Sequence, residues 1–271
     1  MKLTILGSGA AEAIPDPFCR CRVCETARRV GGAHVRARAA ALLNDDLLID
    51  FGPDILSSAN RFNLYLGNLG SILITHRHED HWLPSNILWR EPGFAATPVA
   101  PIAVYGPADA LADLEPLTDR MTHLTFQAVH AGDRWSTGAY QITAIPATHG
   151  HGELEALLYV IDDGVHRLFY ATDTSTLGQT AWDILRPLGP LDLVLLDATS
   201  GLGDGGSGHH GFEKFLLTRA QMLAENLIGE KTTLVAHHFS HNGKLTHDEL
   251  VTRFKPFDVS VSCDGCEFVL T

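Results

Sequence analysis

A short segment of the chain concentrates side chains that bind metal ions. His76, His78, Asp80 and His81 lie within six residues, directly after the apolar run Ser71–Thr75. Burying such groups without partners would be costly, so we interpret them as ligands rather than as a polar surface loop. On a turn, the first two could face one ion and the last two a second ion. Imidazole and carboxylate together suit Zn²⁺, Mn²⁺ or Fe²⁺.

Two ions need roughly six protein ligands, so further ligands are expected downstream. Three candidates each follow an apolar, strand-like run: His149, Asp173 and His238. A carboxylate such as Asp173 can bridge both ions and hold them close together. Two divalent cations lower the pKa of a shared water, so hydroxide becomes available at neutral pH and no side-chain nucleophile is needed. Thr75 and Thr172 are expected to support the ligands.

These candidates are separated by short apolar runs with helical segments between them. The predicted strands are Lys2–Gly7, Ala40–Asp50, Ser71–Thr75, Pro101–Tyr105, Ala139–Ile145, Ala156–Ile161, Arg167–Ala171, Leu191–Leu196 and Thr232–Ala236. Helical periodicity is clearest at Asp54–Arg61, Ala108–Asp119, Ala181–Arg186 and Phe212–Leu227. The order is mixed α/β without strict alternation. We expect one domain over residues 1–271.

Length and charge limit the classes of function. With 271 residues and 45% hydrophobic content the chain can bury a large core. A net charge of −12 argues against nucleic-acid binding. A local basic patch near the N-terminus is either a small anion site or solvated surface charge; it comprises Arg20, Arg22, Arg28, Arg29, Arg36 and Arg38. No apolar run reaches the roughly 20 residues of a membrane span, and no signal peptide is recognisable, so we expect a cytoplasmic protein.

Two further segments bear on the pocket. Gly201–Gly211 is rich in glycine but lacks the spacing of a phosphate loop. It is expected to be a loop over the active site that carries His209 and His210. The segment Trp82–Arg90 is expected either to line the pocket or to belong to the core.

The five cysteines form two groups, Cys19-Arg-Cys21-Arg-Val-Cys24 and Cys263-Asp-Gly-Cys266. An odd number without a secretion signal makes a disulfide framework improbable, and such spacings favour metal binding.

The ligand pattern resembles a known family. The HxHxDH motif with separate downstream His, Asp and His residues is similar to the signature of the metallo-β-lactamase superfamily, which implies an αββα sandwich of two mixed β-sheets flanked by helices. Further motifs resemble the PhnP-type phosphodiesterases, which accompany carbon–phosphorus lyase and open a cyclic ribosyl phosphate. These motifs are Gly7-Ser8-Gly9, the first cysteine group, Leu48-Ile49-Asp50-Phe51-Gly52, Thr172-Asp173-Thr174, Gly208-His209-His210-Gly211, His238-Phe-Ser-His241 and Asp264-Gly265-Cys266-Glu267. The resemblance covers essentially the whole chain.

The resemblance implies a role for each ligand. It assigns the first ion to His76, His78 and His149, the second to Asp80, His81 and His238, and a bridging role to Asp173. The catalytic residues are then His209, which would bind the phosphoryl group or protonate the leaving oxygen, and Asp80. His210 stands where relatives often carry Met. His151 and His237 are neighbours of ligands and weaker candidates.

The resemblance also implies a structural Zn²⁺ held by Cys19, Cys21, Cys24 and His241. This zinc would pin a Cys-rich loop, residues 15–38, beside the active site. Two alternatives stay open. Cys263 or Cys266 could replace His241, or the C-terminal pair could be buried apolar cysteines.

The sequence therefore predicts a metal-dependent hydrolase, with phosphodiesterase activity on small or cyclic phosphodiesters as the first hypothesis. One alternative keeps the fold but cleaves a lactone or thioester, or resembles the pyrroloquinoline-quinone biosynthesis B proteins. Another alternative is a non-catalytic metal-binding protein. The tRNA 3′-processing nucleases are disfavoured by the negative charge. A homodimer is compatible with the superfamily.

Overall fold

The computed structural model describes residues 1–150 and 154–271. Its strands form two seven-stranded sheets. The first sheet has the order β14-β1-β2-β3-β4-β5-β6, with strands Lys2–Gly7 (β1), Ala40–Leu43 (β2), Leu47–Ile49 (β3), Ser71–Leu73 (β4), Ile102–Gly106 (β5), Leu124–Ala128 (β6) and Glu267–Val269 (β14). The second has the order β13-β12-β11-β10-β9-β8-β7, with strands Arg134–Thr137 (β7), Tyr140–Pro146 (β8), Leu157–Asp162 (β9), Arg167–Ala171 (β10), Leu193–Asp197 (β11), Thr233–His237 (β12) and Val259–Val261 (β13).

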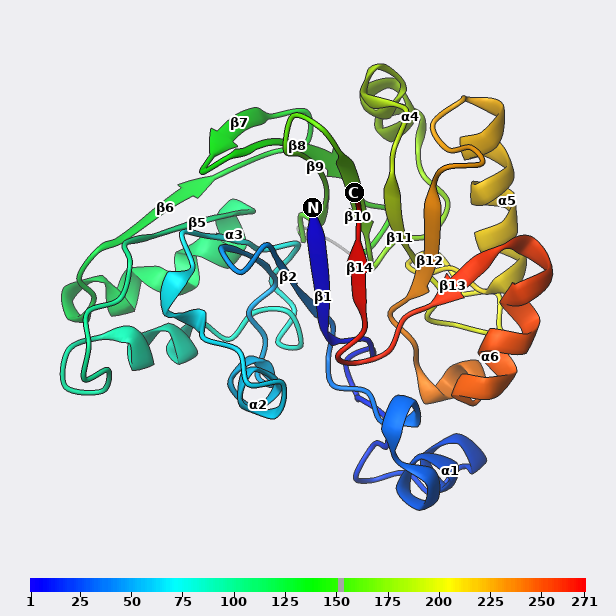
Figure 1. The fold of residues 1–271 in the computed structure, drawn as a ribbon, viewed down its shortest axis with the longest axis horizontal. Coiled ribbons are helices and arrows are strands. Elements are labelled where there is room, and N and C mark those ends of the chain that lie inside the picture. Colours follow the sequence, from blue (N-terminus) through cyan, green and yellow to red (C-terminus); the bar gives the residue numbers. More distant parts are fainter. Residues whose placement is uncertain (151–153) are drawn as a thin grey trace.

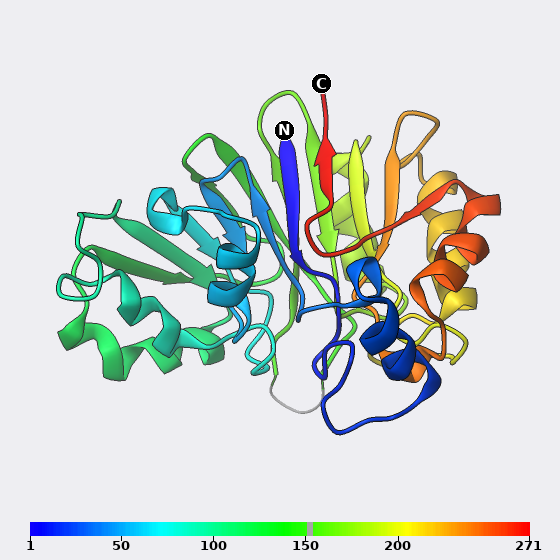
Figure 2. The same ribbon diagram turned by 60° about the horizontal axis from the view of Figure 1, so that its bottom comes forward.

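Helices cover the outer faces of both sheets (Figures 1 and 2). On the first sheet lie α2 (Ile55–Arg61) and α3 (Ala108–Leu111), and on the second α4 (Gln179–Leu185), α5 (Phe212–Ala224) and α6 (His247–Phe254). The N-terminal helix α1 (Arg22–Val30) projects at the lower edge in Figure 1. Three apolar clusters match these layers: one packs between the sheets and one lies under each helical layer. The expected αββα sandwich is confirmed.

Both sheets are mixed in a way that matters for the site. In each sheet, antiparallel strands on one side give way to a run of parallel strands, β3 to β6 in the first and β10 to β13 in the second. Parallel neighbours have their carboxyl ends at one edge, which is where open α/β sheets bind ligands. Residues that follow β3, β4, β10, β11 and β12 are therefore brought to a common edge.

The predicted strand Ala40–Asp50 is wrong as a single element. The structure breaks it into the hairpin β2–β3, because Asn44 and Asp45 adopt φ values of 46° and 66° and reverse the chain. Asn and Asp tolerate this left-handed conformation well. The helix predicted over Ala108–Asp119 is α-helical for one turn and continues as a 3₁₀ helix. The strands β6, β7, β13 and β14 and the helices α1 and α6 were not predicted.

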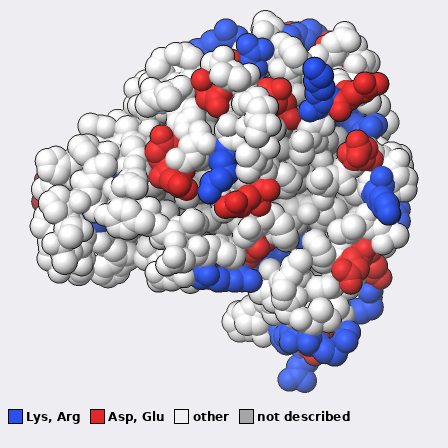
Figure 3. Space-filling model, viewed as in Figure 1, with Lys and Arg blue, Asp and Glu red and all other residues white. Residues whose placement is uncertain are grey.

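Half of the arginines in the basic patch expected near the N-terminus are paired with acidic side chains. Positive side chains gather at the bottom of the molecule in Figure 3, where α1 lies in Figure 1. Arg22 pairs with Glu249, Arg28 with Glu25, and Arg38 with Asp54. Arg36 is buried. Of the two interpretations, paired and solvated surface charge fits better than an anion site.

Among the described helices, none combines the length and apolarity that crossing a bilayer requires.

Candidate metal centre

Three histidines from distant parts of the chain form the first cluster of ligand atoms. His76 Nε2 lies 2.9 Å from His78 Nδ1, and His149 Nε2 lies 3.3 Å from the same nitrogen. Two nitrogens that share a tetrahedral zinc ion at about 2.1 Å lie roughly 3.4 Å apart. The first two side chains follow β4 and the third follows β8. The cluster therefore has the spacing of a single-ion site.

A second cluster lies beside the first. His81 Nε2 is 3.1 Å from an Asp80 oxygen and 3.1 Å from Asp173 Oδ2, and His238 Nε2 is 2.9 Å from the same Asp173 oxygen. The other oxygen of Asp173 lies 3.8 Å from His149 Nε2. Asp173 thus stands between the two clusters, with one oxygen toward each.

Buried atoms without partners, and carboxylates without Lys or Arg beside them, indicate whether cations fit between the two clusters. His81 Nε2, Asp173 Oδ2 and His238 Nε2 are buried and have no hydrogen-bond partner within the described residues. Leaving such atoms unmatched costs free energy. In the described part of the chain, Asp80 and Asp173 form ion pairs with histidines only. A pair of divalent cations would balance the charge of these carboxylates and accept the lone pairs of the histidine nitrogens.

Burial sets the protonation of two ligands. Desolvation lowers the pKa of His76 well below its usual value, and it also lowers the pKa of His149. Both imidazoles are therefore neutral at physiological pH, which is the form that binds metal.

Four of the five histidine ligands are oriented through their other nitrogen by a partner among the described residues. The four contacts are His76 Nδ1 with Thr75 Oγ1 at 2.9 Å, His81 Nδ1 with Asp50 Oδ2 at 2.7 Å, His149 Nδ1 with the Gly208 carbonyl at 3.0 Å and His238 Nδ1 with Thr199 Oγ1 at 2.8 Å. Such partners fix ring orientation and raise ligand basicity.

Of the two threonines expected to support ligands, Thr75 does so. Besides contacting His76, its hydroxyl donates to Asp50. The hydroxyl of Thr172 is buried and makes no hydrogen bond to a ligand in the part of the chain that the structure describes.

Two aspartates that carry this arrangement were missed from the sequence. Asp50 follows β3 and accepts hydrogen bonds from the Thr75 amide and hydroxyl as well as contacting His81. Asp197 ends β11 and contacts His209 Nδ1 at 3.0 Å. Both lie at strand ends, and this position in the sequence could have indicated that they support the site.

A left-handed backbone conformation orients three of these side chains. Asp50, Asp173 and His238 adopt φ values of 64°, 53° and 64° just past their strands. Non-glycine residues seldom adopt this left-handed conformation, although Asp and His do so more readily than most. Such local strain is common at functional sites.

The clusters open into a cavity of about 590 Å³. Its wall includes the ligands His78, Asp80, His149, Asp173 and His238, together with His209. Glu12, Asp204, Ser240 and Asn242 complete much of the remainder. The described lining includes neither Lys nor Arg, and it does not include the segment Trp82–Arg90, where Trp82 is buried against Phe51.

His209 stands on the cavity wall with its Nδ1 held by Asp197. Burial lowers the pKa of His209, but the hydrogen bond and charge of Asp197 outweigh this and raise it to about 9. Divalent cations bound nearby would lower the pKa again by repulsion.

His210 and His237, whose roles the sequence left open, do not line the cavity. His210 is buried, contacts Thr218 on α5, and has its pKa lowered to about 4 by desolvation. His237 is buried against Ser262. His151 lies outside the described residues.

The first cysteine group meets His241. Cys19 Sγ and Cys21 Sγ lie 3.7 Å and 3.6 Å from His241 Nδ1, and Cys24 completes a group whose ligand atoms are all within 4.8 Å of one another. The opposite nitrogen of His241 lies 3.6 Å from Glu12, which also lines the cavity. This arrangement joins the Cys-rich loop to the cavity wall.

Neither alternative for the C-terminal cysteines holds. Cys263 and Cys266 are bonded to each other in a disulfide. They take no part in the cysteine–histidine cluster, and both are partly exposed rather than buried as free thiols.

Comparison with known proteins agrees with this geometry. Residues 46–239 match the family model described as a beta-lactamase superfamily domain, and the chain belongs to the metallo-β-lactamase superfamily.

Solved structures share the fold over nearly the whole chain. A diphosphatase from the PhnP family superposes with a TM-score of 0.77 at 22% identity, covering 100% of this chain and 98% of the other. Zinc-bound PqqB from Methylobacterium extorquens also has a TM-score of 0.77, at 20% identity, with complete coverage of both chains. At these identities the likeness concerns the fold.

One curated protein matches over a limited segment. An octanoyltransferase of Porphyromonas gingivalis is 36% identical over 87 residues, which are 30% of this chain. The match spans 16% of that protein's length, so it carries no conclusion about activity here.

Proposed function

We propose that this protein is a metal-dependent phosphodiesterase that hydrolyses small or cyclic phosphodiesters. The observation that carries the proposal is the placement of His209 on the wall of a cavity whose floor holds two ligand clusters joined by Asp173. A PhnP-family diphosphatase and zinc-bound PqqB share this fold with the same TM-score of 0.77, so our preference for phosphoryl chemistry rests on His209.

We assign the first ion to His76, His78 and His149, the second to Asp80, His81 and His238, and a shared position to Asp173. Two bound Zn²⁺ or Mn²⁺ ions would neutralise phosphoryl oxygens and supply hydroxide at neutral pH. The protein's own contribution is to orient these ligands and to place His209. Its Nδ1 contacts Asp197, and its Nε2 makes no hydrogen bond within the described residues. That nitrogen can donate a proton to the departing oxygen.

The cavity supports a small substrate. Its volume is in the range of sites for small molecules. A polyanion gains affinity from clustered Lys and Arg, whereas the described wall offers Glu12 and Asp204. A substrate with a single phosphodiester charge suits this wall better than a nucleic acid.

The activity can be tested with bis(p-nitrophenyl) phosphate. Metal-loaded wild type should release p-nitrophenolate, and His76→Ala should lose at least about 10³-fold in rate, because each ion contributes several kcal/mol. His130→Ala, which alters an exposed histidine, is the control. Equal rates for wild type and His76→Ala would refute the assignment, and preferential cleavage of a thioester or lactone would redirect it.

We further propose that Cys19, Cys21, Cys24 and His241 hold a structural Zn²⁺. Cys21→Ser should reduce the metal content from about three ions per chain to about two. A site filled a thousandfold above its Kd contributes about 4 kcal/mol to stability, so the unfolding midpoint in urea should fall clearly.

Arg20→Ser, an exposed change in the same loop, is the matched control and should leave metal content and midpoint unchanged. Elemental analysis and denaturant titration provide the readouts. A Cys21→Ser protein that retained all three ions would exclude this site.

A further inference from the structure

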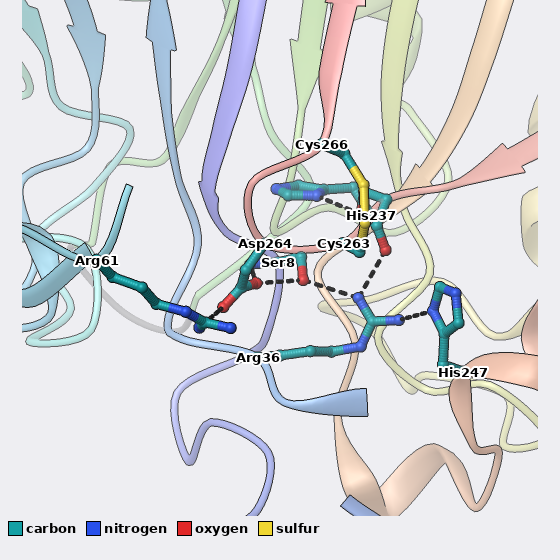
Figure 4. Close-up of a disulfide and its surroundings, with 9 residues drawn as sticks. Ser8, Arg36, Arg61, His237, His247, Cys263, Asp264 and Cys266 are labelled. Atoms are coloured by element: carbon teal, nitrogen blue, oxygen red, sulfur yellow. Dashed lines mark hydrogen bonds and ion pairs between the residues drawn. A yellow bond between two sulfur atoms is a disulfide. The ribbon is translucent and has the colours of Figure 1, made fainter. Parts of the chain in front are cut away.

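The disulfide Cys263–Cys266 lies where the chain crosses between the sheets. It closes the turn between β13, at the edge of the second sheet, and β14, at the edge of the first (Figure 4). The two Cα atoms are 5.4 Å apart, within the usual range for a disulfide. Bridging so short a loop removes little chain entropy from the unfolded state, so stabilising the fold is a weak reason for its presence.

The two residues between the cysteines form hydrogen bonds with Ile5 in β1 and with Ser8 just after it. Asp264 is buried, and its carboxylate accepts hydrogen bonds from the Ser8 amide at 2.9 Å, the Ser8 hydroxyl at 2.7 Å and the Ala37 amide at 2.7 Å. Gly265 donates its amide to Ile5 at 2.7 Å with φ +83°. A Cβ at Gly265 would come within 2.7 Å of the Phe62 ring, so this position of the turn requires glycine.

This turn reaches the metal centre on both sides of His238. The Ser8 carbonyl accepts a hydrogen bond from the Phe239 amide at 2.9 Å. Ser262 Oγ contacts His237 Nδ1 at 2.8 Å. His237 is therefore held by Ser262, which precedes Cys263. Phe239 is held by Ser8, which is hydrogen-bonded to Asp264 within the disulfide-closed turn.

The two cysteines differ in their position relative to the surface. Cys266 lines an open surface hollow of about 460 Å³, and Cys263 is not among the residues that line it. Lys255, Asp258 and Glu267 also line this hollow, so it offers one positive and two negative side chains to a thiol that enters. Exchange requires access to a sulfur and a nearby leaving thiol. Cys266 borders the hollow, and Cys263 is the thiol that would leave.

We propose that Cys263–Cys266 is a thiol–disulfide exchange site whose redox state controls how firmly the metal centre is held. The thiolate of a small-molecule thiol attacks Cys266 Sγ, forms a mixed disulfide there and releases the Cys263 thiolate. A second thiol then attacks the mixed disulfide, so two thiols become one disulfide and the protein gains two thiols. A small-molecule disulfide reverses both steps. The reduced turn holds Ser8 and Ser262 less tightly, and the His238 side of the metal centre loosens.

The experiment uses the metal-loaded protein in buffers of rising glutathione to glutathione-disulfide ratio. Alkylation followed by peptide mass spectrometry reports residues 263 and 266 separately from the other cysteines. The rate of metal transfer to a chromogenic chelator is measured in parallel. We expect both cysteines to become alkylated and metal transfer to accelerate severalfold, with both changes reversed by glutathione disulfide.

Single variants test the direction of attack. In Cys263→Ser the free Cys266 should take up glutathione from its disulfide as a stable mixed disulfide, whereas Cys263 in Cys266→Ser should react much more slowly. The double variant Cys263→Ser/Cys266→Ser should lose metal at one rate in every buffer.

A disulfide that stays closed in excess glutathione would overturn the proposal. So would reduction that leaves metal transfer unchanged, or a double variant that responds like wild type. Neither readout uses a substrate, so these outcomes are independent of whether the protein cleaves phosphodiesters.

Discussion

Asp173→Asn is expected to empty most of the active-site metal and to lower phosphodiester hydrolysis by at least about 10³-fold. The change keeps the size of the side chain but removes its charge. Asp173 Oδ2 lies 2.9 Å from His238 Nε2 and 3.1 Å from His81 Nε2, and its other oxygen faces His149. A neutral amide binds divalent cations weakly in comparison with a carboxylate, and both proposed ion positions share this one group.

The readouts for Asp173→Asn are elemental analysis and initial rates. Metal content should fall from about three ions per chain toward the single ion of the cysteine–histidine cluster. That remaining ion makes the result specific, because general unfolding would release it too. Asp183→Asn, which alters a solvent-exposed carboxylate on α4, should change neither quantity. Full retention of metal by Asp173→Asn would mean that Asp173 bridges nothing.

His209→Ala is expected to lower kcat by about 10² to 10⁴ for a phosphodiester with an alkyl leaving group while leaving the metal content unchanged. An alkoxide needs a proton as it departs. His209 lines the cavity, and its Nε2 has no hydrogen-bond partner among residues 1–150 and 154–271. p-Nitrophenolate is stable without protonation, so the loss with bis(p-nitrophenyl) phosphate should be far smaller. This dependence on the leaving group separates proton donation from a merely structural role.

Asp197→Asn should reduce the rate less than His209→Ala does. Its carboxylate holds His209 Nδ1 at 3.0 Å and also accepts from the Thr199 hydroxyl, and loss of such an orienting partner typically costs 10- to 100-fold, roughly. His130→Ala serves as the control again. If His209→Ala slowed both substrates by the same factor, proton donation would be excluded, and a role in shaping the cavity would remain.

Much of the candidate site could be predicted from the sequence because its signal is local. His76, His78, Asp80 and His81 follow one apolar run at a spacing that other roles do not explain. The cysteines of the N-terminal loop carry a similar local signal. The structure brings these residues together with the predicted distant partners, and their binding of metal is the proposal that the experiments above address.

Adjacent residues of the same type could not be told apart from the sequence. His237 and His238 are neighbours, yet one is the last residue of β12 and packs against Ser262, whereas the other turns toward Asp173. Side chains alternate across a strand, and the positive φ of His238 re-aims the chain just past its end. His209 and His210 differ likewise, one lining the cavity and the other contacting α5.

Residue type and spacing along the chain thus indicated a mixed α/β fold and which side chains could bind metal, and the resemblance of the motifs implied the αββα sandwich. Only the tertiary structure decided which of them meet, that Asp50 and Asp197 orient the histidines, and that Cys263 and Cys266 bond to each other. The physical reason is that ligand chemistry belongs to the single residue. Orientation depends instead on strand register and on the backbone angles at strand ends, which are set by packing between two sheets.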